Sequence, residues 1–195
     1  MGRHGVRRMS GRTHVIILNG VGSVGKSSTA RALQEIAAKP FLHVSMDAFV
    51  EMLPLGMLGH PDGLTFETTV QESGKPCVAI RSGPVMARAL RGMRHAIAAM
   101  AAQGNDLIVD DVILEADGLR DYATLLSRFD FRTVGLFAPL DVLEARERMR
   151  GDREVGLARW QFSRVHRGAT YDLEIETANA TPLENACRIC AAFGL

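Results

Sequence analysis

Short apolar runs alternate along the chain with longer segments in which apolar residues recur every three or four positions. The runs have the length of buried strands, and they predict five of them, at residues 14–18, 41–46, 107–114, 131–138 and 173–177. The periodic segments predict helices at residues 26–38, 48–53, 85–103, 118–129, 140–150, 156–167 and 182–193. This alternation is typical of the α/β class, here with three α/β/α layers built on a five-stranded parallel sheet.

Residues 55–84 interrupt the alternation. Glycine and proline occur throughout this segment, and only short pieces at residues 64–67 and 77–81 have the pattern of a small hairpin. A loop of this length is unusual inside a compact domain unless it has a function. We therefore expect residues 14–195 to form a single domain, in which an insertion at about residues 55–84 walls a substrate pocket.

The segment N-G-V-G-S-V-G-K-S-S lies between the first predicted strand and the helix that follows it. It matches G-x-x-x-x-G-K-[ST], the phosphate-binding loop of P-loop NTPases. The backbone N–H groups of such a loop bind a phosphate chain together with the N-terminus of the helix. The nucleotide-binding residues predicted here are Gly20, Val21, Gly22, Ser23, Val24, Gly25, Lys26, Ser27 and Ser28.

Two residues of this loop have individual expected roles. Lys26 would reach the β- and γ-phosphates, and the Ser27 hydroxyl would bind Mg²⁺. A glycine-rich turn of an unrelated α/β protein is the alternative, but the order of strand, loop and helix favours a nucleotide site. Because no N-K-x-D segment, the guanine-reading sequence of small GTPases, is present, ATP is the expected nucleotide.

Composition narrows the class of protein. The chain has 195 residues, of which 47% are hydrophobic and 23% are charged, as is ordinary for a soluble globular protein. The net charge of +1 gives no general reason to expect nucleic acid as a partner, and no apolar run approaches the roughly 20 residues of a membrane span. The basic residues 1–13 lack the apolar stretch of a secretory signal and are predicted to be a mobile tail, with a nucleic-acid-binding arm as the alternative.

The three cysteines do not make a disulfide framework, which fits a reducing, cytoplasmic location. Cys187 and Cys190 have the spacing of a redox or zinc pair, but no second Cys/His pair accompanies them. We interpret them as small apolar residues on a core-facing helix.

Acidic residues follow the second and third predicted strands, at the edge where open parallel sheets bind ligands. Asp110 is expected to hold Mg²⁺ and its water shell, with Asp111 as the alternative and a turn or capping acid as the simpler role. Asp47 is a candidate general base that accepts the proton of a hydroxyl during phosphoryl transfer. It is also placed to cap the helix that begins at residue 48, and the two roles are compatible.

Arginines are concentrated after the fourth strand, in the run R-E-R-M-R-G-D-R at residues 146–153. We expect this run to close over the nucleotide and to neutralise charge on the transferring group, with Arg146 among the nucleotide-binding residues. A solvated helix end, where arginine suits the helix dipole, is the alternative.

Several segments together resemble the chloramphenicol phosphotransferase-like kinases, from Val15 to about Ala192. The matching pieces are Ile16–Gly20 leading into Gly25–Ser27, Asp47 with Glu51–Leu55, Ile108–Val112, Arg146–Glu147, Arg150–Arg153, Val165–His166, Gly168 and Tyr171–Asp172. The resemblance implies a fold like that of the nucleotide monophosphate and shikimate kinases. It also implies ATP-dependent phosphorylation of a primary hydroxyl of the antibiotic.

The same resemblance implies roles for individual residues. The aspartate that matches Asp47 deprotonates the acceptor hydroxyl, and the arginines that match Arg150 and Arg153 lie at the nucleotide and the transferring phosphate. Residues 55–84 match poorly, so the acceptor of this chain is less well defined than its chemistry.

The predicted function is therefore Mg·ATP-dependent phosphorylation of a hydroxyl of a small molecule, chloramphenicol or a related compound. The acceptor is expected against apolar residues that are otherwise ordinary core, namely Met52, Leu53, Pro54 and Met57. The alternatives are a kinase for another metabolite, such as a nucleotide or a sugar, and a regulatory module that binds NTP. The expected partner is the small-molecule acceptor, without nucleic acid or membrane, and homo-oligomerisation is left open.

Overall fold

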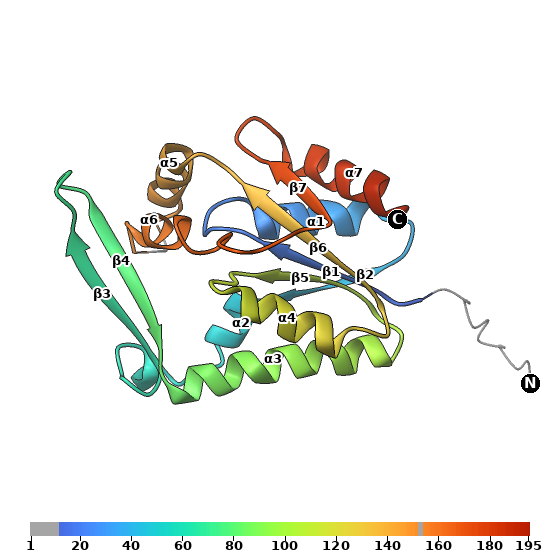
Figure 1. Ribbon diagram of the computed structural model, residues 1–195, viewed down its shortest axis with the longest axis horizontal. Helices are drawn as coiled ribbons and strands as arrows, with labels where there is room; N and C mark the ends of the chain where they lie inside the picture. Colours follow the sequence, from blue (N-terminus) through green and yellow to red (C-terminus); the bar gives the residue numbers. More distant parts are fainter. Residues whose placement is uncertain (1–11, 152–153) are drawn as a thin grey trace, which may run out of the picture.

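The computed structural model describes residues 12–151 and 154–195, so almost all of the predicted N-terminal tail lies outside the described residues. Five strands form one sheet in the order β2-β5-β1-β6-β7 (Figure 1). Every neighbouring pair is parallel, which confirms the predicted sheet. The strands are β1 (His14–Asn19), β2 (Phe41–Ser45), β5 (Asp106–Asp111), β6 (Asp130–Phe137) and β7 (Leu173–Glu176).

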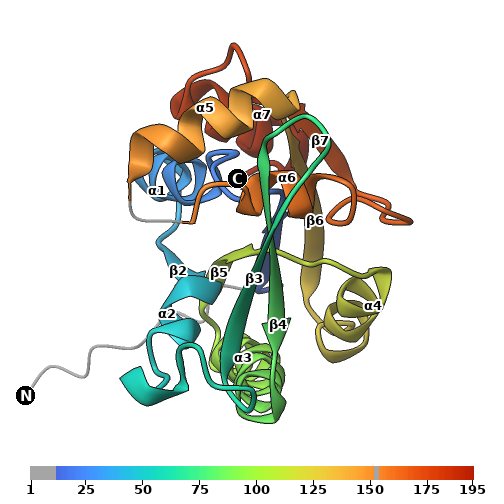
Figure 2. The same ribbon diagram turned by 90° about the vertical axis from the view of Figure 1, so that its left-hand side faces the viewer.

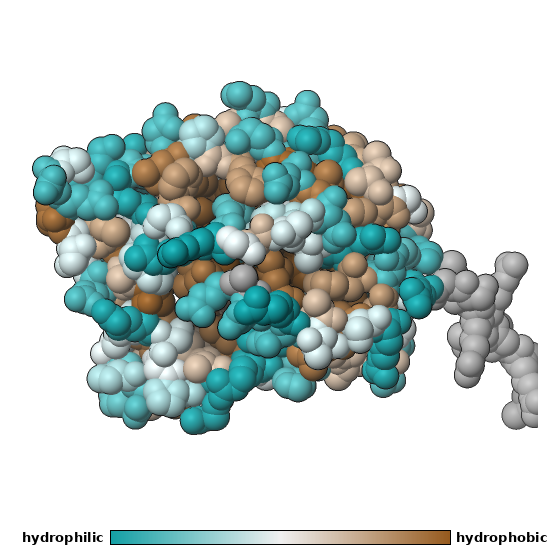
Figure 3. All heavy atoms as spheres, in the orientation of Figure 1, coloured by the Kyte–Doolittle hydropathy of each residue, from teal (hydrophilic) through white to brown (hydrophobic). Residues whose placement is uncertain are grey.

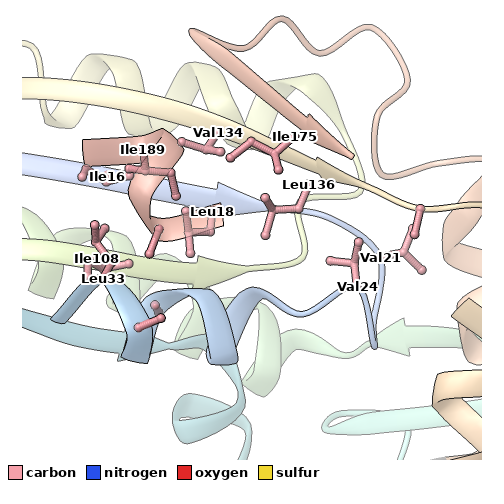
Figure 4. Close-up of a cluster of buried hydrophobic side chains, with 14 of the residues drawn as sticks. Ile16, Leu18, Val21, Val24, Leu33, Ile108, Val134, Leu136, Ile175 and Ile189 are labelled. Atoms are coloured by element: carbon pink, nitrogen blue, oxygen red, sulfur yellow. The ribbon is translucent and has the colours of Figure 1, made fainter. Parts of the chain in front are cut away.

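Helices cover both faces of this sheet, because alternate residues of a strand point to opposite faces. Ile16 and Leu18 of β1 pack toward α1 (Lys26–Ile36) and α7 (Pro182–Phe193), as Figure 4 shows. Val15 and Ile17 pack toward α3 (Pro84–Ala102) and α4 (Ala116–Leu125). The two clusters confirm the predicted three-layer arrangement, and hydrophilic residues cover much of the face that Figure 3 shows.

Three further helices lie beyond the carboxyl ends of the strands. α5 (Leu140–Arg150) ends at Gly151, which adopts a left-handed φ of 68°, and α6 (Leu157–Phe162) follows it. On the opposite side, α2 (Met46–Val50) begins directly at the end of β2. These elements surround the edge of the sheet at which the phosphate loop emerges (Figure 1).

The insertion contains more regular structure than its sequence predicts. It consists of a short 3₁₀ turn, η1 (Leu55–Met57), and an antiparallel hairpin of β3 (Leu64–Val70) and β4 (Pro76–Ser82). The hairpin is a separate two-stranded sheet that runs from the start of α3 toward α5 and α6 (Figure 2). The Val78 N–H donates to the Gly156 carbonyl at 3.0 Å, so the hairpin is tied to the segment that leads into α6.

Two elements end earlier than the sequence predicts, and in each case a side chain hydrogen-bonds to a backbone group just beyond the observed end. The strand predicted to reach residue 114 ends at Asp111, whose own carboxylate accepts the Val112 N–H at 2.7 Å. The helix predicted to reach residue 167 ends at Phe162, and the turns after it bring the Val165 carbonyl to the Asn19 side chain.

Two cysteines lie on α7, as predicted, but only one of them faces the core. Cys190 packs against the buried cluster, whereas Cys187 is exposed. The interpretation of both as core residues was therefore wrong for Cys187, because the buried stripe of α7 runs through Asn185, Ala186 and Ile189 instead. In the part of the chain that the structure describes, no helix has the length and hydropathy needed to cross a bilayer.

Candidate active site

The two signature glycines of the phosphate loop are required for different reasons. A Cβ atom on Gly20 would lie 2.7 Å from the Leu136 carbonyl oxygen, so only glycine lets β1 pass this close to β6. Gly25 has a φ of 101° and turns the chain into α1. The turn between them places the loop at the N-terminus of α1, where it lines a cavity of about 430 Å³.

Ser23, in the middle of this loop, is held in an unusual conformation. Among residues 12–151 and 154–195 it is the one non-glycine residue with a positive φ, at 65°. Its Oγ is buried and has no hydrogen-bond partner among the described residues. Strained residues of this kind persist only where the surrounding structure fixes them, and they gather at functional sites.

Lys26 lies inside the loop rather than in solvent. Its side chain is 7% exposed, and its Nζ donates to the carbonyls of Gly20 at 2.8 Å and Val21 at 3.2 Å. The same ammonium lies 4.0 Å from Asp110 Oδ1. A buried positive charge at the centre of the loop is suited to binding phosphate oxygens.

Ser27 and Asp110 form the group that fits Mg²⁺. The Ser27 Oγ donates to Asp110 Oδ2, and the ring of His43 lies 3.7 Å from the same oxygen. Burial favours the neutral carboxyl, but His43, Lys26 and Ser27 outweigh it and lower the pKa of Asp110. An ionised carboxylate beside a hydroxyl supplies the hard oxygen ligands that Mg²⁺ prefers.

Asp111 points the other way, as strand geometry requires of the neighbouring residue. Its carboxylate accepts hydrogen bonds from the Val112 N–H at 2.7 Å and the Tyr122 hydroxyl at 2.9 Å. Burial raises the pKa of Asp111. The structure therefore brings Asp110, and not Asp111, to the phosphate loop.

Asp47 lies in the first turn of α2. The Ser45 hydroxyl accepts the Asp47 N–H at 3.2 Å and caps the helix, so the interpretation of Asp47 as the cap was wrong. Asp47 lines the nucleotide-loop cavity and also a second cavity of about 670 Å³, which lies between α2, the hairpin and α6. Asp47 is thus a lining residue of both cavities.

The wall of the second cavity differs from the predicted one. Its apolar lining comes from α2, both hairpin strands and α6, through Met46, Val50, Leu64, Phe66, Ile80 and Leu157. Of the predicted residues, Leu53 is buried and Met57 packs beside it in a small cluster under the hairpin, while Met52 is 68% exposed. Met52, Leu53, Pro54 and Met57, which were expected to lie against the acceptor, line neither of these two cavities, because they precede the hairpin whose face forms the wall of the second one.

Helix α5, which carries most of the arginine run, contributes lining residues to both cavities. Arg146 lines the first cavity, where its guanidinium donates to the backbone carbonyls of Thr177 at 2.8 Å and Ala178 at 3.3 Å. Arg150 lines the first and the second cavity. Arg153, which was predicted to accompany it, lies outside the described residues.

Two buried polar residues support the site without belonging to any motif. The Asn19 side chain accepts the Ile113 N–H at 2.9 Å and donates to the Tyr171 hydroxyl at 2.8 Å, which holds the ends of β1 and β5 in place. Gln161 of α6 contacts the phosphate loop across 139 positions of sequence. Sequence reasoning assigned neither residue a role, although Asn19 lies in the matching piece Ile16–Gly20 and a polar residue at the end of an apolar strand is a recognisable signal.

His166 gives this region a pH dependence. Its ring stacks on Phe137 with centroids 3.9 Å apart, and burial lowers its pKa from 6.5 to about 4. The unfolded chain therefore binds more protons between these pH values, so stability is full above pH 6.5 and falls as the pH drops toward 4. We expect His166→Gln to reduce this slope, by at most about 1.4 kcal/mol per pH unit, in urea unfolding measured from pH 7 to 4. Equal slopes for both proteins would contradict this prediction.

Known proteins resemble this chain over most of its length. Residues 13–194 match the family described as chloramphenicol phosphotransferase-like protein. A protein of Mycobacterium tuberculosis H37Rv, named "Putative O-phosphotransferase Rv2636", is 32% identical over 178 residues, covering 89% of this chain and 79% of that protein.

Solved structures share the fold at low sequence identity. The APS kinase CysC of M. tuberculosis, in complex with AMPPNP and APS, has a TM-score of 0.65 at 17% identity, over 94% of this chain and 99% of that one. Shikimate kinase from Bacteroides thetaiotaomicron has a TM-score of 0.59 at 17% identity, over 93% and 99% of the two chains. The fold is thus that of the P-loop NTPases, and the chain belongs to the chloramphenicol phosphotransferase-like family of kinases.

Proposed function

We propose that this protein transfers the γ-phosphoryl group of Mg·ATP to a hydroxyl of a small molecule, chloramphenicol or a related compound. The observation that carries the proposal is the position of Asp47, which lines both the cavity of the phosphate loop and the cavity beside it. A base in this position meets a hydroxyl on one side and a terminal phosphate on the other, as in-line transfer requires.

Each step has a residue to perform it. Lys26 and the loop amides bind the phosphates, while Ser27 and Asp110 would hold Mg²⁺, whose charge would offset that of the phosphate oxygens. The Asp47 carboxylate accepts the proton of the acceptor hydroxyl as its oxygen bonds to the γ-phosphorus. The bond from that phosphorus to the bridging oxygen breaks, ADP leaves, and Arg150 and Arg153 stabilise the charge of the transferring group.

The lining of the second cavity limits the acceptor. Beside its apolar wall it carries the acids Asp47, Glu51 and Glu154, and Arg150 is the one cation among its described lining residues. Acids of this number disfavour a carboxylate or a phosphate in the same space. The cavity therefore favours an uncharged alcohol with an apolar body, a class to which chloramphenicol belongs, over an anionic metabolite.

Mass spectrometry of chloramphenicol incubated with the protein and Mg·ATP tests the proposal directly. We expect a product heavier by one phosphoryl group, formed only in the presence of the protein. A panel of uncharged alcohols, sugars and nucleosides in the same assay identifies the acceptor if chloramphenicol is not modified. Slow ATP hydrolysis that no acceptor changes would count against the kinase and for a regulatory NTP-binding module.

Phe66 is expected to bind the acceptor and not the nucleotide, because it lines the second cavity alone. Phe66→Ala should raise the KM of the acceptor found in that panel by about tenfold, or about 1.4 kcal/mol, through lost aromatic contact. The KM of ATP should stay unchanged. Glu67→Gln is the matched control, since Glu67 is the next residue of β3 and pairs with Arg81 away from the cavity. An unchanged acceptor KM in Phe66→Ala would place the acceptor elsewhere.

A further inference from the structure

Gln161 connects the second cavity to the phosphate loop through a single side chain. It lies on α6, its side chain is 3% exposed, and its Oε1 accepts the Gly22 N–H of the phosphate loop at 2.7 Å. It also lines the second cavity. A buried amide oxygen that loses its hydrogen-bond donor costs free energy. The contact between Gln161 and Gly22 therefore fixes the loop relative to α6.

The contact falls next to the strained residue of the loop. Gly22 directly precedes Ser23, whose φ of 65° is unfavourable for a residue with a side chain. Inside the loop, the Val24 N–H donates to the Val21 carbonyl at 3.2 Å, which closes a turn around Gly22 and Ser23 but does not involve the Gly22 N–H. Gln161 supplies the outside contact that holds Gly22, and with it the start of the strained turn.

α6 is itself fixed by elements of both cavities. Glu147 of α5 is 2% exposed, and its carboxylate accepts the N–H of Gly156 at 2.8 Å and of Ala158 at 2.7 Å. The Gly156 carbonyl in turn accepts the Val78 N–H of the hairpin at 3.0 Å. The position of Gln161 is therefore set by α5 on one side and by strand β4 of the hairpin on the other.

We propose that Gln161 is a positioning residue for the phosphate loop: it holds the Gly22 amide so that the loop keeps its nucleotide-binding shape before ATP arrives. The inference rests on the proposed function only in that the loop binds ATP. Helix α6, which lies outside the G-x-x-x-x-G-K-S motif, thereby contributes to the affinity for the nucleotide.

The test is direct binding of the ATP analogue AMPPNP with Mg²⁺, measured by titration calorimetry on the full chain. Gln161→Met keeps the length of the side chain and removes the acceptor oxygen, and we expect its Kd to rise about tenfold, or about 1.4 kcal/mol. Gln161→Glu keeps an oxygen in the same place and should stay within about threefold of the wild type. Phe162→Ala is the control on the same helix, because Phe162 is 43% exposed and lines neither cavity.

Thermal unfolding without nucleotide separates positioning from stability. A purely structural role would lower Tm without changing Kd in the folded protein, and that result would overturn the inference, as would equal Kd values for Gln161→Met and Gln161→Glu. Should Gln161→Met not fold, Gln161→Asn shortens the reach by one methylene and is expected to weaken binding in its place. Unchanged binding by a folded Gln161→Asn would also overturn the inference.

The two proposals fail in different ways. If the wild type binds AMPPNP and Gln161→Met weakens that binding, the inference holds even where no acceptor is phosphorylated. If the wild type does not bind AMPPNP, the proposed function fails at its first step and the inference fails with it.

Discussion

Lys26→Ala is expected to abolish phosphoryl transfer to every acceptor, with a loss of about three orders of magnitude or more in kcat/KM. The ammonium is buried at the centre of the phosphate loop, 2.8 Å from the Gly20 carbonyl and 4.0 Å from Asp110. A charge held in a water-poor site acts on developing phosphoryl charge without reorganisation, and there it is worth far more than in water.

The loss of activity must be distinguished from a loss of folding, because Lys26 also donates hydrogen bonds to the Gly20 and Val21 carbonyls of the loop. Lys26→Met keeps the packing of the aliphatic stem and should lose the same activity, while circular dichroism and Tm report the fold. Lys39→Ala, which removes a lysine that lines neither cavity, should retain full turnover. Substantial transfer by Lys26→Met would show that the loop is not the phosphate site.

Asp47→Asn is expected to lower kcat by about two orders of magnitude or more, while folding and AMPPNP binding remain intact. Asparagine has almost the shape of aspartate but does not accept the hydroxyl proton. Because the Ser45 hydroxyl caps α2, the substitution leaves the start of the helix unchanged. The expected loss is therefore one of chemistry and not of structure.

Single-turnover kinetics with saturating ATP and acceptor measure this step. Asp141→Asn is the control, since Asp141 lies in the first turn of α5, an exposed position that lines neither cavity. A wild-type rate in Asp47→Asn would show that Asp47 is not the base. Another residue where the two cavities meet would then have to accept the proton of the hydroxyl.

Features fixed by local chemistry could be predicted from the sequence. The glycine loop was found because Gly20, Gly25 and Lys26 have steric and electrostatic roles that few other residues fill. The sheet followed from apolar runs at the length of strands. The sequence left open which of Asp110 and Asp111 faces the phosphate loop, because this depends on strand phase; the structure places Asp110 against Ser27, and its role at the metal stays a prediction.

Features fixed by distant contacts could not be predicted in the same way. Gln161 and Gly22 meet only because α6 packs beside the loop, and nothing local marks either residue. The insertion at about residues 55–84 was expected to wall a substrate pocket, but the glycines and prolines around its two strands made the predicted hairpin pieces shorter than the seven residues of each strand. The alternation of Leu64, Phe66 and Ile80 was the available signal, since these side chains share one face of the hairpin.

The hairpin forms its own sheet, outside the hydrogen-bonded ladder that carries the phosphate loop. Polar contacts between the hairpin and the rest of the protein include Val78 to Gly156 at 3.0 Å, Lys75 to Glu144 at 3.3 Å and Arg159 to Gln71 at 3.1 Å. Replacement of its cavity-facing side chains therefore leaves the core of the main sheet untouched. If the hairpin contacts the acceptor as proposed, the choice of acceptor is free to diverge between relatives while the nucleotide-binding part of the enzyme stays constant. We expect chimeras that exchange the hairpin to accept different substrates and to bind AMPPNP with unchanged affinity.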